Sequence, residues 1–222
     1  MSWAVEVRRE SPADLHARPL PDPLERAVWV ADASVPTLVL GSGQPDDVVD
    51  RAACEQAGVA VARRRSGGGA VLVEPGRVLW LDVLLPAGDP LWRDDVAKAF
   101  LWLGEVWRDA LMALDVPARV HEGGSCTTPW SRLVCFGGLG TGEVVDEAGV
   151  KLVGLSQRRT RVGARFQCMA MAAWEPAAIV SLLALSPRDR SDAVAALSGA
   201  ARAVPAPLDA LRAEVLAQLR YR

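Results

Sequence analysis

The chain has 222 residues, of which 50% are hydrophobic and 23% are charged, and its formal net charge at pH 7 is −2. This composition excludes a disordered chain, because it supplies enough apolar side chains for a sizeable packed core. The near-neutral charge argues against a general binder of nucleic acids or acidic membranes, since both attract an excess of positive charge. It remains compatible with a local basic cluster that binds one small anion.

The N-terminal residues and the cysteines indicate a cytoplasmic protein with reduced thiols. Charged residues among positions 6–10 interrupt the region where a signal peptide needs an apolar run, and no later run approaches membrane-spanning length. The four cysteines show no Cys-x-x-Cys spacing, and the two histidines, His16 and His121, lie far apart. The sequence therefore predicts neither a metal site nor a disulfide framework.

The first third of the chain begins with a segment that lacks a regular pattern. Four prolines within residues 1–25 predict an extended lead-in with little regular structure. A strand is then expected at 37–41, followed by a helix at 46–57 with acidic residues in its first turn. Further strands are expected at 59–63 and 69–73, on either side of a glycine-rich segment.

The middle of the chain contains its strongest strand and helix signals. Residues 78–85 form a long apolar run, which predicts a strand in the middle of a sheet. Between 94 and 115, apolar residues recur at spacings of three and four, which predicts an amphipathic helix. Strands follow at 118–121, 133–136, 150–155 and 166–172, and helices at 176–185, 188–197 and 207–219. This order predicts an α+β fold with a mixed or antiparallel sheet, one long amphipathic helix and C-terminal helices.

A basic, glycine-rich string separates two of the predicted strands. Its residues are Arg63, Arg64, Arg65, Ser66, Gly67, Gly68, Gly69 and Ala70. Consecutive glycines let the backbone approach a ligand closely and expose its N–H groups, while guanidiniums bind phosphate or carboxylate. The string therefore predicts an anion-binding loop, and the alternative is a solvated basic hairpin. It is not a P-loop, because Gly-Lys-Ser is absent.

A second segment of interest starts with one of the chain's rare lysines. Lys98 and Lys151 are the only lysines among 25 basic residues. Lys151 opens an apolar strand, where a partly desolvated ammonium can hold a carbonyl or carboxylate oxygen and stabilise developing negative charge. The alternative is an ordinary lysine at a strand edge. Because arginine is the usual basic residue of this chain, the lysine favours a functional role, whereas Lys98 is expected on the solvated face of the long helix.

The third segment contains a cysteine at the entrance to a glycine-rich loop. Cys135 ends an apolar run and is followed by four glycines within residues 137–142. A thiolate is a competent acyl nucleophile, so this sulfur is a candidate to meet a substrate. The alternative is a small core residue. We interpret Cys54 and Cys168 as packing residues of this kind.

Taken together and in this order, the three segments resemble the lipoate-protein ligase and octanoyltransferase family, which shares its catalytic domain with biotin-protein ligases. The likeness extends from about residue 37 to 172 and includes Gly41 and Gln44 in the family's Gly-x-x-Gln position. It implies a class II biotin/lipoate ligase-like catalytic domain at 26–175, after the lead-in at 1–25, and a short C-terminal helical cap at 176–222.

The resemblance also implies an activity. A ligase of this family attaches lipoyl or octanoyl groups to a lysine of a lipoyl-domain carrier protein through an acyl-AMP intermediate, using ATP and Mg²⁺ with lipoate or octanoate. Lys151 would contact the acyl carbonyl, with Trp80 and Val71 as candidates for the tunnel wall. The substrate and cofactor contacts implied are Arg63, Arg64, Ser66, Gly67, Gly68, Gly69, Ala70, Gly154, Ser156 and Gln157. Lys151, Cys135 and residues 67–69 are expected to converge on one pocket.

Two alternatives stay open at this point. One branch of the family transfers octanoyl groups from acyl carrier protein through a covalent thioester on the cysteine of a Cys-Phe pair, which Cys135 and Phe136 match. Such an octanoyltransferase or amidotransferase takes an acyl thioester or an acylated protein and needs no ATP. The other alternative is a non-catalytic homologue that binds a cofactor or a partner, because Val73, Phe166 and Gln167 stand where the family carries polar or His-Gly residues.

Overall fold

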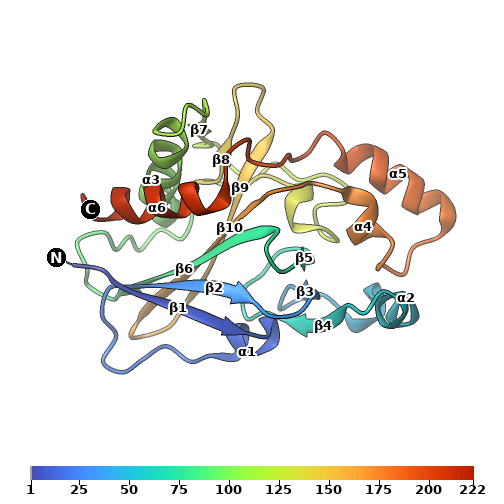
Figure 1. Cartoon of the computed structure of the whole chain (residues 1–222), viewed down its shortest axis with the longest axis horizontal. Coiled ribbons are helices and arrows are strands. Elements are labelled where there is room, and N and C mark those ends of the chain that lie inside the picture. The colour runs from blue at the N-terminus through green and yellow to red at the C-terminus, as the bar shows by residue number, and fades with distance from the viewer. Residues whose placement is uncertain (1) are drawn as a thin grey trace.

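The computed structural model describes residues 2–222 and centres on a seven-stranded mixed sheet (Figure 1). Its strands, in spatial order, are β1 (Ala4–Glu10), β2 (Ala27–Ala33), β6 (Val78–Pro86), β10 (Gly163–Met171), β9 (Lys151–Arg159), β8 (Val144–Val145) and β7 (Arg119–Val120). β1 and β2 pair in parallel, and the other neighbours pair antiparallel. The predicted α+β class with a mixed sheet is confirmed.

A second, three-stranded sheet carries the glycine-rich string. Its order is β4 (Ala60–Arg63), β3 (Thr37–Leu40) and β5 (Val71–Val73). β3 pairs in parallel with β4 and antiparallel with β5. All four residues of β3 are buried, as expected for a central strand between two neighbours. The string therefore connects the two outer strands of this small sheet.

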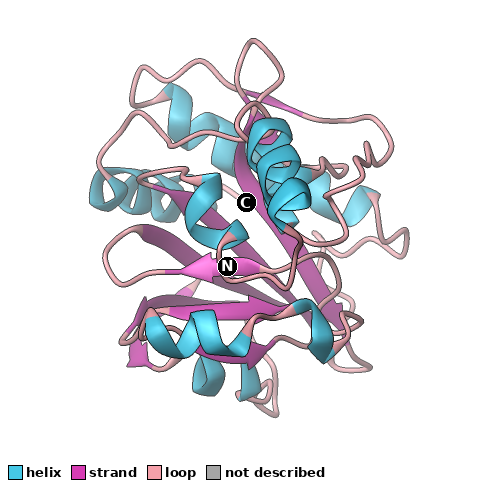
Figure 2. Ribbon diagram, turned by 90° about the vertical axis from the view of Figure 1, so that its right-hand side faces the viewer, coloured by secondary structure: helices cyan, strands magenta, loops and turns pink. Residues whose placement is uncertain are grey.

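Helices cover the larger sheet and fill the periphery (Figure 2). They are α1 (Pro12–Ala17), α2 (Arg51–Gln56), α3 (Leu101–Met112), α4 (Pro176–Val180), α5 (Pro187–Leu197) and α6 (Leu208–Leu219), with short 3-10 turns at Asp46–Val48, Lys98–Phe100 and Cys135–Gly137. α3 presents Leu103 and Trp107 to a core shared with β6 and α6. Burial of each such side chain contributes about 1.5–3 kcal/mol, so the amphipathic spacing is explained by packing against the sheet.

The expectation of a lead-in with little regular structure is wrong for residues 4–17. β1 pairs with β2 along its whole length, and α1 begins at Pro12 with Ser11 as its N-cap. β1 is an edge strand whose side chains are mostly exposed, so it lacks the apolar alternation by which strands are recognised. The division of the chain at residues 25 and 175 stays a prediction.

Two further elements differ from expectation in the same region of the molecule. The strand expected at 133–136 is instead largely a 3-10 turn, with a single bridge between Ala70 and Val134. The helix expected at 46–57 is divided into a 3-10 turn and α2, because Asp50 caps the second part through its side chain. No helix within residues 2–222 combines the length and hydrophobicity needed to cross a bilayer.

Candidate functional site

The segment 64–70, which we call the glycine loop, is held in place by a buried arginine. Arg64 donates from Nη2 to the backbone oxygens of Gly67 and Gly69, at 2.7 and 2.8 Å. Its Nη1 donates to the backbone oxygen of Val39 on β3, at 3.3 Å. Hydrogen bonds from a charged group are among the stronger ones, and this group is 4% exposed. The guanidinium therefore fixes the curvature of the loop from inside.

The glycine loop also lies unusually close to the end of β3. A Cβ atom added to Gly41 would lie 1.9 Å from the backbone oxygen of Gly68. We expect Gly41→Ala to lower the free energy of unfolding by about 1–3 kcal/mol, because backbone atoms must move to admit the methyl group. Gly43→Ala is the matched control, since its added Cβ would have no heavy atom within 4 Å. Equal urea midpoints for the two variants would contradict the close approach.

Arg63, expected to bind an anion together with Arg64, is also engaged by the protein. Its Nη1 donates to the backbone oxygen of Gly41 at 2.9 Å, and its guanidinium pairs with Asp46 at 2.5 Å. Both arginines thus hold the loops around the site in this structure. A direct role for either one toward a bound anion stays a prediction.

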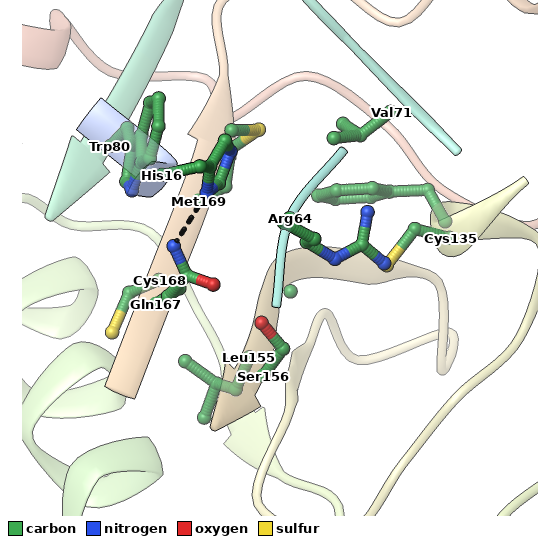
Figure 3. A pocket seen from close by; sticks show the side chains of 12 residues that line it. His16, Arg64, Val71, Trp80, Cys135, Leu155, Ser156, Gln167, Cys168 and Met169 are labelled. Atoms are coloured by element: carbon green, nitrogen blue, oxygen red, sulfur yellow. Dashed lines mark hydrogen bonds between the residues drawn. The ribbon is translucent and has the colours of Figure 1, made fainter. Parts of the chain in front are cut away.

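An apolar cavity, here called the inner cavity, lies behind the glycine loop (Figure 3). It encloses about 40 Å³ between β5, β6, β9 and β10. Its lining residues are His16, Arg64, Val71, Trp80, Cys135, Phe136, Gly154, Leu155, Ser156, Gln167, Cys168 and Met169. Val71 and Trp80, the residues expected in a tunnel wall, are among them. Cys168 also lines it, but burial raises the pKa of its thiol, which supports its interpretation as a packing residue.

A chain of hydrogen bonds forms the polar side of the inner cavity. The hydroxyls of Ser66 and Ser156 are 3.2 Å apart, and Ser66 donates to Oε1 of Gln167 at 2.9 Å. The amide nitrogen of Gln167 lies 3.0 Å from Nδ1 of His16, whose ring stacks on Trp80 with centroids 4.5 Å apart. Figure 3 shows this contact between β10 and the N-terminal histidine. Sequence reasoning missed His16, because it lies in the segment expected to be unstructured.

His16 makes the stability of the protein depend on pH. Burial, followed by the charges of Arg165 and Arg64, lowers its pKa from 6.5 to about 3. The unfolded chain therefore binds a proton between these values that the folded protein excludes. The contribution of His16 to the free energy of unfolding should be fully present above pH 6.5. The free energy of unfolding should then decrease as the pH falls toward 3, by about 2 kcal/mol between pH 7.5 and 5.

Urea unfolding at the two pH values measures this effect. His16→Gln should remove most of the decline attributed to His16, whereas His121→Gln, which replaces the other histidine, should retain it. The same pH dependence in wild type and His16→Gln would contradict the assignment.

A wider depression, the outer groove, opens on the other side of Cys135. It encloses about 550 Å³ and is lined by Gly43, Gln44, Pro45, Val48, Gly68, Ser125, Cys126, Thr127, Ser131, Arg132, Leu133, Cys135, Gly138, Leu139, Gly140, Glu143 and Lys151. Cys135 also lines the inner cavity, so it stands where the two spaces meet. A Cβ added to Gly68 would lie 3.7 Å from the Cys135 sulfur and 2.9 Å from Nη2 of Arg64. The structure thus brings Cys135, Lys151 and the glycine loop to one groove.

The Lys151 ammonium is buried and has three acceptors. Its Nζ lies 2.7 Å from Oε1 of Glu143, 3.1 Å from the backbone oxygen of Gly138 and 3.3 Å from that of Cys135. It also lies 4.8 Å from the centre of the Phe136 ring. All three N–H bonds can therefore be used by the protein, and a substrate oxygen must replace one of the longer contacts.

Glu143 is a site residue that sequence reasoning did not single out. Its carboxylate accepts hydrogen bonds from the backbone nitrogens of Gly140 and Leu155, at 2.8 and 3.0 Å, in addition to its contact with Lys151. Lys151 and Glu143 are 2% and 5% exposed. Buried ions at such positions require each other, because removal of one leaves the other uncompensated. A carboxylate after a glycine run has no local signal by which it could have been found.

Gln157 does not contribute to the cavities, contrary to expectation. Its amide nitrogen instead donates to the backbone oxygen of Val96 at 2.6 Å. Gln157 is among the lining residues of neither the inner cavity nor the outer groove, whereas Gly154 and Ser156 line the inner cavity. Of the remaining expected contacts, Gly67, Gly69 and Ala70 belong to the glycine loop, where Ala70 is fully buried.

Comparison with known proteins adds the relatives of this fold. A family model described as the lipoyl protein ligase A/B catalytic domain matches residues 23–209. A structure of a bi-partite lipoate protein ligase and its E2 lipoyl domain from Thermoplasma acidophilum is similar, with a TM-score of 0.75 and 17% identity, over 100% of this chain and 83% of that one. Protein Ta0514 from the same organism, with bound lipoic acid, gives 0.71 and 14%, over 100% and 86%.

A lipoate-protein ligase A bound with ATP has a TM-score of 0.69 and 19% identity, over 100% of this chain and 85% of that one. No curated protein matched the sequence. At these identities the structural likeness shows only the fold. The family model matches most of the chain, and it is this match that shows the family.

Proposed function

Because the chain belongs to the lipoyl protein ligase A/B catalytic domain family and is therefore an enzyme, we propose that it attaches a lipoyl or octanoyl group to a lysine of a lipoyl-domain carrier protein. One observation carries this proposal. The apolar inner cavity and the open outer groove meet at Cys135, and the Lys151 ammonium lies beside that junction. An acyl chain in the inner cavity would present its carbonyl to both residues.

The inner cavity must widen to admit such a chain. Its volume of about 40 Å³ is well below the roughly 300–1,000 Å³ of pockets that enclose small organic ligands. Two flexible apolar side chains, Leu155 and Met169, form part of the wall. Methionine adapts readily to irregular spaces, and each methylene buried contributes about 0.8 kcal/mol. Entry of an eight-carbon chain would therefore be favourable enough to reposition these walls.

Lys151 would act on the acyl carbonyl. Its contact with the backbone oxygen of Cys135 is the longest of its three, at 3.3 Å, so this acceptor is the easiest to exchange for a substrate oxygen. A buried cation aimed at an oxygen that gains negative charge is worth far more than in water. Glu143 would keep the ammonium in position during the exchange, through its contact of 2.7 Å.

The position of Cys135 supports a thioester route. The Cys135 thiolate would attack the carbonyl carbon of an acyl thioester, and the donor sulfur would leave and take up the proton that Cys135 had lost. The amine of the acceptor lysine would then attack the new thioester, forming an amide. The Cys135 sulfur would leave and recover the proton released by the amine, so that no oxidant or reductant is needed.

An acyl-AMP route is the second candidate, favoured by the size of the outer groove and by the two cations, Arg132 and Lys151, among its lining residues. ATP would supply an activated acyl phosphate there, with lipoate or octanoate as the acid. Residues 2–222 contain no group of three or more His, Cys, Asp or Glu side chains able to hold a metal ion. The engagement of Arg63 and Arg64 by backbone oxygens makes the thioester route the better supported of the two.

Acyl transfer to a lipoyl domain, followed by intact-mass measurement of the acceptor, tests the proposal. We expect octanoyl acyl carrier protein to serve as donor without ATP, whereas octanoate requires ATP and Mg²⁺ if it is used at all. Transfer only from octanoate with ATP would establish the acyl-AMP route instead. Absence of transfer from either donor would overturn the proposed function in favour of a non-catalytic homologue.

A further inference from the structure

Four arginines from four separate segments converge on a cavity of about 250 Å³ next to the inner cavity. Arg18 follows α1, Arg65 belongs to the glycine loop, Arg158 to β9 and Arg165 to β10. We call this space the arginine cavity. Within residues 2–222, no aspartate or glutamate lines it. The convergence is a product of the fold, because these residues are scattered over nearly 150 positions of the sequence.

Two of the four arginines are neutralised by carboxylates behind the cavity wall. Arg165 pairs with buried Asp82, with 3.0 Å between its Nε and Oδ2, and Arg18 pairs with Glu10. Arg165 also donates to the backbone oxygen of Leu15 at 2.7 Å, which ties α1 to β10. These two side chains are paired with carboxylates, and their main role is to hold the wall of the cavity in place.

The other two arginines have no such partners. Arg65 is exposed and Arg158 is half-buried, and neither forms an ion pair or side-chain hydrogen bond with any residue from 2 to 222. Arg158 also stands directly opposite Arg165 in the pairing of β9 with β10. Because Asp82 pairs with Arg165, the charges on this side of the cavity that lack a carboxylate partner are those of Arg65 and Arg158.

We propose that the arginine cavity binds a phosphate group. The two unpaired guanidiniums match the charge of a phosphate dianion, and their planar donors can each bind two phosphate oxygens. Arg65 and Arg158 make the direct contacts. His16 and Gln167 line both this cavity and the inner cavity, so the phosphate lies across one wall from the acyl chain. A phosphate-bearing acyl thioester is one source of this group, and that source rests on the proposed function. Free phosphate is the other.

Calorimetric titration with inorganic phosphate and with pyrophosphate tests the site without reference to activity. We expect Arg65→Gln/Arg158→Gln to weaken binding at least about tenfold, since each bond to a charged group contributes roughly that much. Arg51→Gln/Arg220→Gln is the matched control, because it removes two exposed positive charges elsewhere. Binding that is absent in the wild type, or weakened equally in both double variants, would overturn the proposal.

Thermal unfolding keeps the test independent of misfolding. Without phosphate, Arg158→Gln should melt close to the wild-type temperature, because Arg158 forms no ion pair or side-chain hydrogen bond within residues 2–222 that the substitution would remove. Phosphate should raise the melting temperature of the wild type and leave that of the variant nearly unchanged. A variant that is stabilised by phosphate as much as the wild type would contradict the assignment of Arg158.

The source of the phosphate is identified by comparing two thioester donors that differ only in this group, octanoyl-phosphopantetheine and octanoyl-pantetheine. A higher KM for the phosphorylated donor alone in Arg65→Gln/Arg158→Gln identifies the donor phosphate. Unchanged KM values together with the loss of phosphate titration identify free phosphate. Because the titration does not require turnover, failure of the proposed activity and failure of the phosphate site are distinguishable.

Discussion

Replacement of Lys151 by methionine should reduce acyl transfer by about 100-fold or more, because it removes the cation that we propose stabilises charge on the acyl oxygen. The same substitution should lower the free energy of unfolding by about 3–5 kcal/mol, since it leaves the Glu143 carboxylate buried without its partner. A lower rate in the single variant can therefore come either from lost catalysis or from a smaller amount of folded protein. Rates and urea midpoints must be measured together.

The double variant Lys151→Met/Glu143→Gln separates the two effects. It removes both charges, so most of the lost stability should return, while transfer should stay as low as in the single variant. Glu143→Gln alone should keep the Lys151 charge but lose one ionic contact, and an intermediate rate is expected. Transfer restored in the double variant to the wild-type rate would show that Lys151 is needed for folding only.

Replacement of Cys135 by serine should reduce ATP-independent transfer by about three orders of magnitude or more, because a thioester cannot form on the variant. The covalent intermediate should also disappear from the intact mass of the enzyme after incubation with octanoyl acyl carrier protein. Serine is close to cysteine in size, so the cavity junction should keep its shape.

Cys126→Ser is the matched control for this experiment. Cys126 also lines the outer groove but is exposed and does not line the inner cavity, so its replacement should leave adduct formation intact. An acyl adduct that persists in Cys135→Ser and disappears in Cys126→Ser would show that Cys126 is the nucleophile, and would contradict the assignment to Cys135. Transfer without any adduct, and only with ATP, would support the acyl-AMP route.

Elements with a local apolar period could be predicted from the sequence. β6 covers the strand expected at 78–85, and α3 forms the central part of the helix expected at 94–115, which begins later and follows a 3-10 turn at Lys98–Phe100. β1 could not be predicted in this way, because an edge strand buries little and its side chains need no alternation. The strand expected at 133–136 failed for the opposite reason. Its residues are apolar, but only Val134 is extended and bridges Ala70, and the chain turns into a 3-10 helix at Cys135–Gly137.

The site residues also differ in whether the local sequence could identify them. Lys151, Cys135 and the glycine loop have unusual local sequences, and the structure brings them together at the outer groove. Glu143 and His16 have ordinary neighbours, and only long-range contacts bring them to the site. Gln157 was expected to contact a ligand, but its amide nitrogen donates to the backbone oxygen of Val96 and it lines neither the inner cavity nor the outer groove.

The contact between His16 and Gln167 joins the N-terminal helix to the wall of the inner cavity. The family model matches residues 23–209, yet one wall of the inner cavity comes from His16, which precedes this segment. Arg165 fixes that wall through backbone oxygens of Leu15 and Arg18, whatever side chains those residues carry. Side chains of the N-terminal helix can therefore be replaced, which would alter the shape of the inner cavity, while these backbone contacts keep the helix in place.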